Sequence, residues 1–307
     1  MSLIARCLVG LLLLGVLFAS GLGLLHAGVY GLTVFVIHPM LLGGLACWVF
    51  PPKTGGAALR GFLAVLIASG LLFLAGIDGA ACVALSLPLT LPLGCLGAWL
   101  VHWGASSPTA TRGGLAMLLL LPPASLTWDT HAQPPTYEVR TAITIAASPE
   151  RVWQGIVNLS RFPEPHQWYF RAGLAYPTEV RIEGAFAGAT RTCEFSTGPV
   201  VETIEVWDAP RLLRFRVTEN PAPLREWTPY GEISPKHLHG YLISREGEFR
   251  LTPLPGNRTL VEGTSWYQHG LWPAQYWRFW SDAVFHRIHL RVFNQIKTLA
   301  EADAKPW

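Results

Sequence analysis

The sequence predicts a chain of two unlike parts. The first is an all-α transmembrane bundle of four or five spans, and the second is an α+β domain in which a curved antiparallel sheet wraps around a long C-terminal helix. The distribution of charge predicts the division, because the first 127 residues contain only five charged side chains: Arg6, Lys53, Arg60, Asp78 and Arg112. A series of β-rich segments and one long amphipathic segment predict the second part. We place the boundaries at 1–128 for the membrane region, 129–136 for a linker and 137–307 for the domain.

The bulk composition is that of a membrane protein joined to an ordinary polar domain. The chain has 307 residues, of which 50% are hydrophobic, and its mean hydropathy is +0.32. Removing the charges of the apolar part leaves 19 basic residues (23 − 4) and 19 acidic residues (20 − 1). A domain without net charge lacks the basic surface that nucleic-acid binding requires. Four of the five cysteines lie in the apolar part, so the polar domain has no disulfide framework.

Five apolar runs account for the predicted spans: Leu3–Leu22, Val29–Phe50, Ala57–Gly76, Ala80–Trp103 and Gly113–Trp128. The first four have the roughly 20 residues that a helix needs to cross a bilayer. The fifth is shorter and contains Pro122-Pro123, which leaves its span open. The first run also resembles a cleavable signal peptide, and we favour an uncleaved helix.

The few positive charges predict the orientation in the membrane. Arg6, the pair Lys53 and Arg60, and Arg112 fall in alternate connections between the runs. Because positive charge is enriched on the cytoplasmic side, the N-terminus is expected in the cytoplasm. Five spans, or four after signal cleavage, then place the polar domain outside the cytoplasm, attached to the plasma or inner membrane.

The polar part reads as strand, helix, further strands and a final helix. The β-rich segments are Tyr137–Ile145, Glu179–Glu183, Thr190–Phe195, Val200–Trp207, Leu212–Thr218, Tyr241–Thr252 and Thr259–Tyr267. The last long segment, Trp272–Glu301, has one apolar face formed by Trp277, Val284, Ile288, Val292 and Leu299. Asp282, His286 and His289 follow one another at i, i+4 and i+7, so they stack along the flank of that face.

Three features of the polar part resemble a known family. They are the opening segment ITIAASPERVWQGIVNL, the antiparallel series and the C-terminal helix. The family is the START-like helix-grip superfamily, also described as SRPBCC or polyketide cyclase/dehydrase and lipid transport. The resemblance covers Tyr137–Ala302 and none of the membrane part. It implies a largely apolar cavity between sheet and helix that holds a hydrophobic ligand. Members include lipid carriers, hormone-binding proteins and cyclases, so the fold does not fix the activity. The family has no universal catalytic motif, and no cofactor is expected.

The hairpin around Gly198 supplies the first ligand-binding candidates, Arg191, Cys193 and Glu202. If Phe195 faces Val200 across a four-residue loop, Cys193 faces Glu202, and Arg191 lies diagonal to it on the buried side. Charges in a cavity must pair or bind something polar. A structural ion pair and a one-residue slip that exposes both charges are the alternatives. Cys193 itself is expected to be a small buried hydrophobe rather than a nucleophile.

The segment 220–240, the last β-rich segment and the final helix supply the remaining ligand-binding candidates, which are Trp227, Tyr230, His237, His239, Trp266, Asp282, His286 and His289. Trp227 and Tyr230 suit an aromatic lid over the cavity mouth. Acidic and imidazole side chains, Glu226 among them, are also possible metal ligands. Their spacing matches no sharp motif, so no metal is predicted, and His237, His239, His286 and His289 are only weak metal candidates.

These patterns favour a membrane-anchored domain that binds a lipid or another hydrophobic small molecule. One alternative is a cyclase- or hydrolase-type enzyme that uses Arg191, Glu202 or the Asp282 stripe for acid–base chemistry. Another is an accessory protein that docks on a membrane partner. The sequence leaves open whether the domain is catalytic, and it does not indicate which protein would be a partner.

Overall fold

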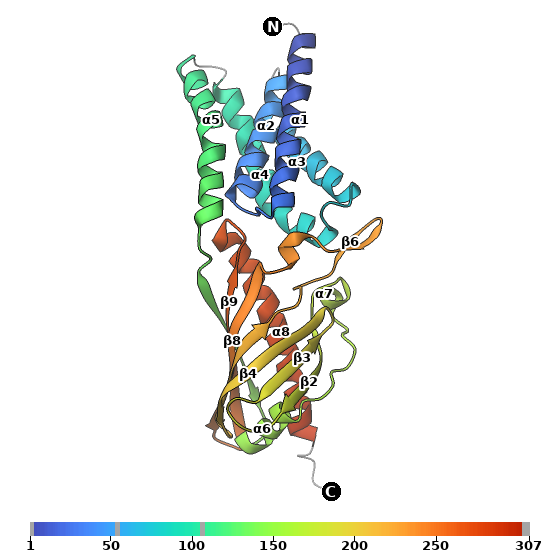
Figure 1. Cartoon of the computed structure of the whole chain (residues 1–307), viewed down its shortest axis with the longest axis vertical. Coiled ribbons are helices and arrows are strands. Elements are labelled where there is room, and N and C mark those ends of the chain that lie inside the picture. Colours follow the sequence, from blue (N-terminus) through green and yellow to red (C-terminus); the bar gives the residue numbers. More distant parts are fainter. Residues whose placement is uncertain (1–2, 53–55, 105–107, 303–307) are drawn as a thin grey trace. The chain divides into compact units, whose positions relative to one another are not determined.

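The computed structural model describes residues 3–52, 56–104 and 108–302, drawn in Figure 1. The chain divides into two compact units, which we call the helical unit and the α+β domain. The helical unit comprises Met1–Gln133, Glu226–His237 and Gly270–Tyr276, and the α+β domain comprises Pro134–Arg225, Leu238–His269 and Trp277–Trp307. Lys53, one of the charges behind the predicted orientation, lies outside the described residues, as do residues 303–307 of the predicted domain.

The helical unit contains α1 (Leu3–Ala27), the π-helix η1 (Thr33–Ile37), α2 (His38–Val49), α3 (Ala57–Leu74), α4 (Ala80–Gly104) and α5 (Pro108–His131). Within the described residues, three helices are long and apolar enough to cross a membrane: Ile4–Ala27, Ala57–Leu74 and Ala80–Gly104. The second predicted run forms a shorter apolar helix, Thr33–Val49. Three of the predicted four or five spans are therefore supported by length and composition.

Glycines let α2 and α3 approach α4 closely. A Cβ atom added at Gly43 would lie 1.9 Å from the carbonyl oxygen of Gly94, and one added at Gly61 would lie 2.1 Å from the same atom. A Cβ atom at Gly97 would lie 2.0 Å from the carbonyl oxygen of Met40. Close packing of backbones through small residues is typical of helix pairs in membranes, where apolar side chains gain little from leaving lipid.

The α+β domain is built on a seven-stranded antiparallel sheet with the order β1-β9-β8-β5-β4-β3-β2. Its strands are β1 (Thr136–Ile145), β2 (Pro177–Glu183), β3 (Thr190–Phe195), β4 (Gly198–Asp208), β5 (Leu212–Glu219), β8 (Leu242–Leu254) and β9 (Arg258–His269). Two short helices, α6 (Pro149–Val157) and α7 (Trp168–Arg171), lie between β1 and β2. Every strand predicted for the polar part is present. The short hairpin of β6 (Glu226–Thr228) and β7 (Gly231–Ile233), followed by the 3-10 turn η2 (Lys236–Leu238), interrupts the series between β5 and β8.

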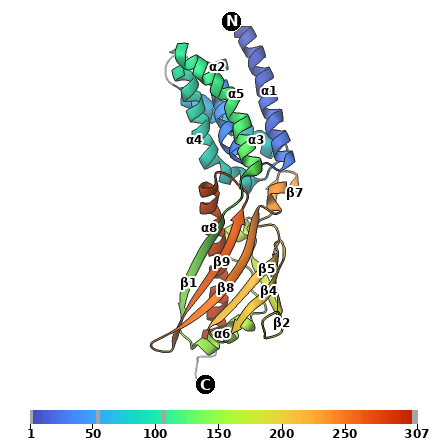
Figure 2. The ribbon, with the colours of Figure 1, turned by 60° about the vertical axis from the view of Figure 1, so that its left-hand side comes forward.

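The long helix α8 (Ala274–Ala302) runs along one face of the sheet, as Figure 2 shows. Phe293 has no exposed surface, and its ring centroid lies 6.1 Å from that of Phe249 on β8. Its ring also occupies the space above Gly263 on β9, where a Cβ atom would lie 2.6 Å from the ring. The helix and the sheet therefore share one apolar core, as the resemblance to helix-grip proteins implied.

The prediction that Leu299 lies on the buried face of this helix was wrong, because 38% of Leu299 is exposed. The buried row toward the C-terminus instead runs through Val292, Ile296 and Ala300. Steps of four residues advance by about 40° around the helix. The contact line with the sheet thus rotates away from Leu299 and leaves it at the solvent edge.

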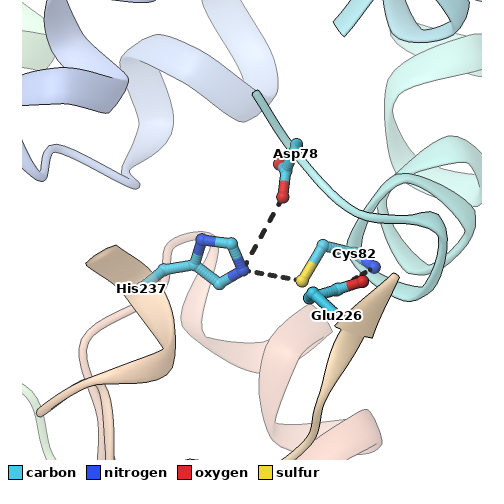
Figure 3. A group of neighbouring side chains, drawn as sticks. All are labelled: Asp78, Cys82, Glu226 and His237. Carbon is cyan, nitrogen blue, oxygen red and sulfur yellow. Dashed lines mark hydrogen bonds and ion pairs between the residues drawn. The ribbon is translucent and has the colours of Figure 1, made fainter. Parts of the chain in front are cut away.

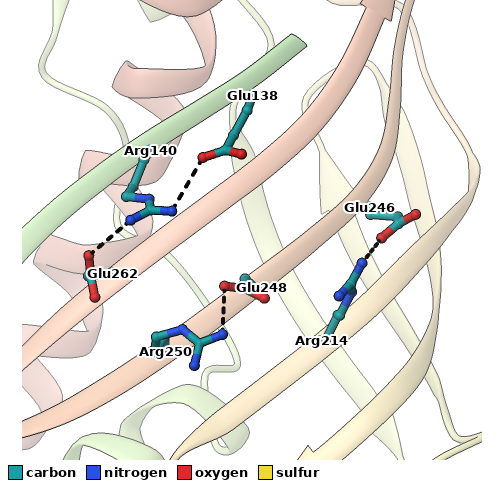
Figure 4. A network of polar contacts seen from close by, with 7 residues as sticks. All are labelled: Glu138, Arg140, Arg214, Glu246, Glu248, Arg250 and Glu262. Carbon is teal, nitrogen blue, oxygen red and sulfur yellow. Dashed lines mark hydrogen bonds and ion pairs between the residues drawn. The ribbon is translucent and has the colours of Figure 1, made fainter. Parts of the chain in front are cut away.

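The outer face of the sheet carries charged pairs rather than apolar side chains. Figure 4 shows the network formed by Glu138, Arg140, Arg214, Glu246, Glu248, Arg250 and Glu262. Exposed pairs of this kind contribute little to stability, roughly 0–1 kcal/mol each. Their effect is to keep this face polar, so that the apolar face of the sheet is the one covered by α8.

Replacing Phe293 by alanine should destabilise the α+β domain strongly. Removing a fully buried phenylalanine typically costs about 3–5 kcal/mol, because the neighbours cannot close the cavity that is left. The measurement is guanidinium denaturation of the full-length protein in detergent, followed by near-ultraviolet circular dichroism. Leu299→Ala on the same helix is the matched control and should cost less than about 1 kcal/mol. Equal losses in the two variants would contradict the described seating of α8.

Candidate functional site

A cavity of about 140 Å³ lies inside the α+β domain, between α8 and the sheet. Its wall is mostly apolar and includes Phe195, Val200, Phe215, Phe249, Ile288 and Val292. The loop Asn220–Pro223, which follows β5, also contributes to the wall. An apolar hollow with a few polar groups in its wall is the usual form of a small-molecule site.

The β3–β4 hairpin sets which side chains enter this cavity. The strands pair Phe195 with Gly198, Cys193 with Val200 and Arg191 with Glu202. The predicted pairing of Phe195 with Val200 was therefore wrong by two residues. The chain reverses over Ser196-Thr197 alone, and Gly198 takes a φ of +137°, a conformation that other residues rarely adopt. A shift of two residues keeps every side chain on its predicted face, whereas the alternative one-residue slip would have exposed the charges.

Arg191 and Glu202 form a buried ion pair in the cavity wall, with only 4% and 7% of their side chains exposed. Nη1 of Arg191 donates to Oε2 of Glu202. The guanidinium carbon lies 5.0 Å from the ring centroid of Phe215 and 5.8 Å from that of Phe249. Burial raises the pKa of Glu202 despite the opposing attraction of Arg191. Among the described residues, the buried Nε of Arg191 has no hydrogen-bond partner.

Cys193 lies in the same wall beside this pair. Burial is the main reason why the pKa of its thiol rises to about 12, and it outweighs the attraction of Arg191. At neutral pH the side chain is therefore an uncharged thiol. This environment fits a small buried hydrophobe better than a nucleophile.

The predicted stripe on α8 is tied to the sheet by hydrogen bonds. The Thr141 hydroxyl oxygen lies 2.9 Å from Nδ1 of His286 and 3.0 Å from Nδ1 of His289. The other ring nitrogen of His289, Nε2, lies 2.9 Å from Oγ of Ser265. Of the stripe residues, only His289 lines the cavity. Burial, aided by His286, lowers the pKa of His289 to about 4. His289 is thus a neutral, doubly hydrogen-bonded group in the cavity wall.

Asp282 lies one turn before these histidines and has its own partners. Its Oδ1 accepts a hydrogen bond of 2.5 Å from the Tyr267 hydroxyl, and its Oδ2 accepts one of 3.3 Å from Nε of Arg278. Burial, together with this hydrogen bond, raises the pKa of Tyr267 well above its usual range. The Asp282 carboxylate therefore acts as an anchor between α8 and β9.

The remaining predicted candidates are not among the residues that line the cavity. Trp266 faces the outer side of the sheet, where the Arg214 guanidinium carbon is 5.2 Å from its ring. His239 is exposed. Trp227, Tyr230 and His237 belong to the helical unit. Of the predicted candidates, those in the cavity wall are Arg191, Cys193, Glu202 and His289.

His237 instead joins a group that the sequence pattern did not indicate, shown in Figure 3. The group consists of Asp78, Cys82, Glu226 and His237. Each residue offers one potential metal-ligating atom, and these four atoms all lie within 4.8 Å of one another. All four residues belong to the helical unit. Glu226 and His237 were weighed as possible ligands from the sequence, but Asp78 appears there only as one of the five charges of the apolar part and Cys82 as part of an apolar run.

Residues 136–269 match the family model "Polyketide cyclase / dehydrase and lipid transport". The match covers the region from β1 to β9 and does not extend to the preceding helices. Domains of this type commonly bind hydrophobic ligands. No curated protein sequence matches the chain.

Solved structures similar to this chain include norcoclaurine synthase from Thalictrum flavum, with 12% identity and a TM-score of 0.36 over 55% of this chain and 96% of that one. The Zhui aromatase/cyclase from Streptomyces sp. R1128 has 16% identity and a TM-score of 0.37, over 56% and 97% of the two chains. The protein XoxI from Bacillus cereus has 16% identity and a TM-score of 0.37, over 55% and 99%.

Acidification should destabilise the α+β domain through His289. The unfolded chain takes up a proton at this side chain below about pH 6.5, whereas the folded domain resists protonation until about pH 4. Stability is therefore fully present above pH 6.5 and is lost as the pH falls toward 4, by on the order of 2 kcal/mol. The measurement is the denaturation free energy at pH 7 and at pH 4.5. His289→Gln should flatten this dependence, and His166→Gln, at an exposed position, should not. An unchanged slope in His289→Gln would refute the assignment.

Proposed function

We propose that the α+β domain binds a hydrophobic small molecule that carries one polar group, and that the cavity between the sheet and α8 is its site. The observation that supports this most directly is that Arg191 lines the cavity and that its buried Nε has no hydrogen-bond partner among the described residues. An unsatisfied buried donor costs about 1–3 kcal/mol. A hydroxyl, carbonyl or carboxylate oxygen on a ligand would recover that cost.

The size of the cavity favours a compact ligand. An engineered apolar cavity of about 150 Å³ accepts benzene, whereas sites for drug-sized ligands span roughly 300–1,000 Å³. At about 140 Å³, this cavity matches one ring or a short branched chain. A two-chain lipid would require α8 or the Asn220–Pro223 loop to move. We therefore place single-ring and short-chain molecules ahead of whole lipids as the preferred ligand class.

The polar groups of the wall favour binding over catalysis. A general acid or base works best when its pKa lies near the operating pH and a proton can reach it. Here Cys193 holds its proton, Glu202 is paired with Arg191, and both ring nitrogens of His289 are engaged. Each group is suited to recognising a ligand, and the described wall provides no activated nucleophile.

The proposal includes attachment of the domain to a membrane. Three helices of the helical unit are long and apolar enough for this role. An apolar ligand partitions into the bilayer, so anchoring would keep the domain where its ligand is concentrated. We further propose that the N-terminus is cytoplasmic and that the α+β domain lies outside the cytoplasm, as the distribution of positive charge favours.

The binding proposal predicts that a compact apolar molecule co-purifies with the full-length protein. Organic extracts of the wild type and of Val284→Phe, which places a ring in the cavity, are compared by mass spectrometry. The molecule should be present in the wild type and at least tenfold depleted in Val284→Phe. Leu299→Phe on the exposed edge of α8 controls for detergent and bulk lipid. Identical extracts from all three proteins would refute binding at this site.

The ion pair should behave as a unit in stability measurements. Arg191→Met or Glu202→Leu alone leaves one buried charge unpaired and should cost about 3–5 kcal/mol. The double variant Arg191→Met/Glu202→Leu replaces the pair by apolar side chains and should recover most of that loss. Guanidinium denaturation measures all three. Additive losses in the double variant would show that the two charges are not coupled.

The same double variant also tests recognition of the ligand. Because it keeps the cavity apolar but removes the Arg191 donor, it should retain folding and lose the co-purifying molecule at least tenfold. Undiminished recovery of that molecule would show that Arg191 does not contact it.

A further inference from the structure

We propose that Asp78, Cys82, Glu226 and His237 form a binding site for a divalent transition metal, with zinc as the preferred ion. The site lies within the helical unit and is independent of the proposed ligand cavity. A thiolate, an imidazole and two carboxylates are the ligand types that zinc takes in proteins. The four potential ligand atoms already lie within 4.8 Å of one another.

Two stretches far apart in the sequence bring these side chains together. Asp78 occupies the turn before α4, and Cys82 lies in the first turn of that helix. Glu226 begins β6, and His237 lies in η2, so both come from the 226–237 segment. The contacts between these two stretches join residues 144 to 155 positions apart, so local sequence preference does not bring the stretches together. A contact that joins such distant segments through metal-ligating groups is what a structural metal site provides.

The buried carboxylate of Glu226 is held in a fixed position. It is fully buried, and its oxygens accept hydrogen bonds from the backbone N–H groups of Ala81 at 3.1 Å and Cys82 at 2.7 Å. These donors belong to the first turn of α4, where the helix dipole favours negative charge. Each carboxylate oxygen keeps a further lone pair, so the cap and a metal bond are compatible.

Gly79 makes room for this arrangement. A Cβ atom at Gly79 would lie 2.0 Å from Oε2 of Glu226 and 2.5 Å from its carboxyl carbon. A glycine is therefore required between Asp78 and Cys82 for the carboxylate to enter. The ring of His237 is in turn covered by Tyr30, with ring centroids 4.6 Å apart.

The ring nitrogen of His237 that the neighbouring side chains approach distinguishes a metal site from a Cys–His catalytic pair. Sγ of Cys82 lies 2.6 Å from Nε2 of His237, and Oδ1 of Asp78 lies 3.9 Å from the same nitrogen. In a nucleophile–histidine–acid relay, the acid contacts the opposite ring nitrogen. Here thiol, carboxylate and imidazole converge on one point, which is the geometry of shared coordination.

Charge also favours a cation at this point. The carboxyl groups of Asp78 and Glu226 lie close together there, where water is scarce and like charges repel. A divalent ion would remove that repulsion. With Zn–S near 2.3 Å and Zn–N near 2.0–2.1 Å, the thiolate and imidazole atoms of a tetrahedral site stand about 3.6 Å apart. Cys82 and His237 would therefore separate by about 1 Å when the ion enters.

Four protein ligands make a closed site, which is typical of structural rather than catalytic zinc. The role that follows is to fasten the 226–237 segment to the start of α4. The site would act as a clamp within the helical unit rather than as a place where substrate reacts.

The test is metal content and cobalt spectroscopy of the full-length protein purified in detergent. Wild type should carry about one zinc per chain, measured by inductively coupled plasma mass spectrometry. After chelation and addition of Co²⁺, it should show the intense visible bands of tetrahedral cobalt and a thiolate-to-cobalt charge-transfer band. Absence of both zinc and the thiolate band in the wild type would overturn the proposal.

Matched variants assign the ligands. Cys82→Ser and His237→Gln should each lower zinc content at least tenfold, and Cys82→Ser should abolish the charge-transfer band. Cys95→Ser on the same helix and His239→Gln, two residues from His237, should leave both signals unchanged. A band that survives Cys82→Ser, or that is lost equally in Cys95→Ser, would overturn the assignment.

If the ligand variants fail to fold, the rate at which the Cys82 thiol is alkylated in the wild type provides the test. Zn²⁺ should slow its alkylation at least tenfold, and an unchanged rate would refute the site.

Discussion

The seating of Phe293 above Gly263 is the contact on which the α+β domain depends. The missing side chain at Gly263 lets the ring of Phe293 lie directly against the backbone of β9. That contact fixes how closely α8 approaches the sheet at this level. The cavity adjoins this contact, and its wall includes Phe249, Ile288 and Val292 as well as Gly263.

The charged groups of the cavity follow from the same constraint. A side chain on the concave face of the sheet cannot reach solvent once α8 covers it, so each charge there needs a partner. Arg191 and Glu202 stand directly opposite each other on neighbouring strands and satisfy most of that need. In the function we propose, the remaining Nε donor of Arg191 would orient the ligand in the cavity.

Hydrogen bonds also hold polar side chains of the same helix in place. His289 and Asp282 each have two partners. Their orientation is therefore fixed by the packing of α8 against the sheet. Cys82 and His237 lie in the helical unit instead, where their side chains meet two carboxyl groups.

The sequence by itself determined the division into an apolar and a polar part, all seven strands of the sheet, the final helix and the face on which Arg191 and Glu202 lie. These follow from local periodicity and composition, which act over a few residues. The tertiary structure decided the hairpin register, the exposure of Leu299 and the assignment of Trp227, Tyr230 and His237 to the helical unit. It also brought Asp78 and Cys82 to Glu226 and His237. Such outcomes depend on two-residue turn geometry, on the rotation of a helix against a curved sheet and on contacts between residues nearly 150 positions apart, none of which leaves a periodic signal in the chain.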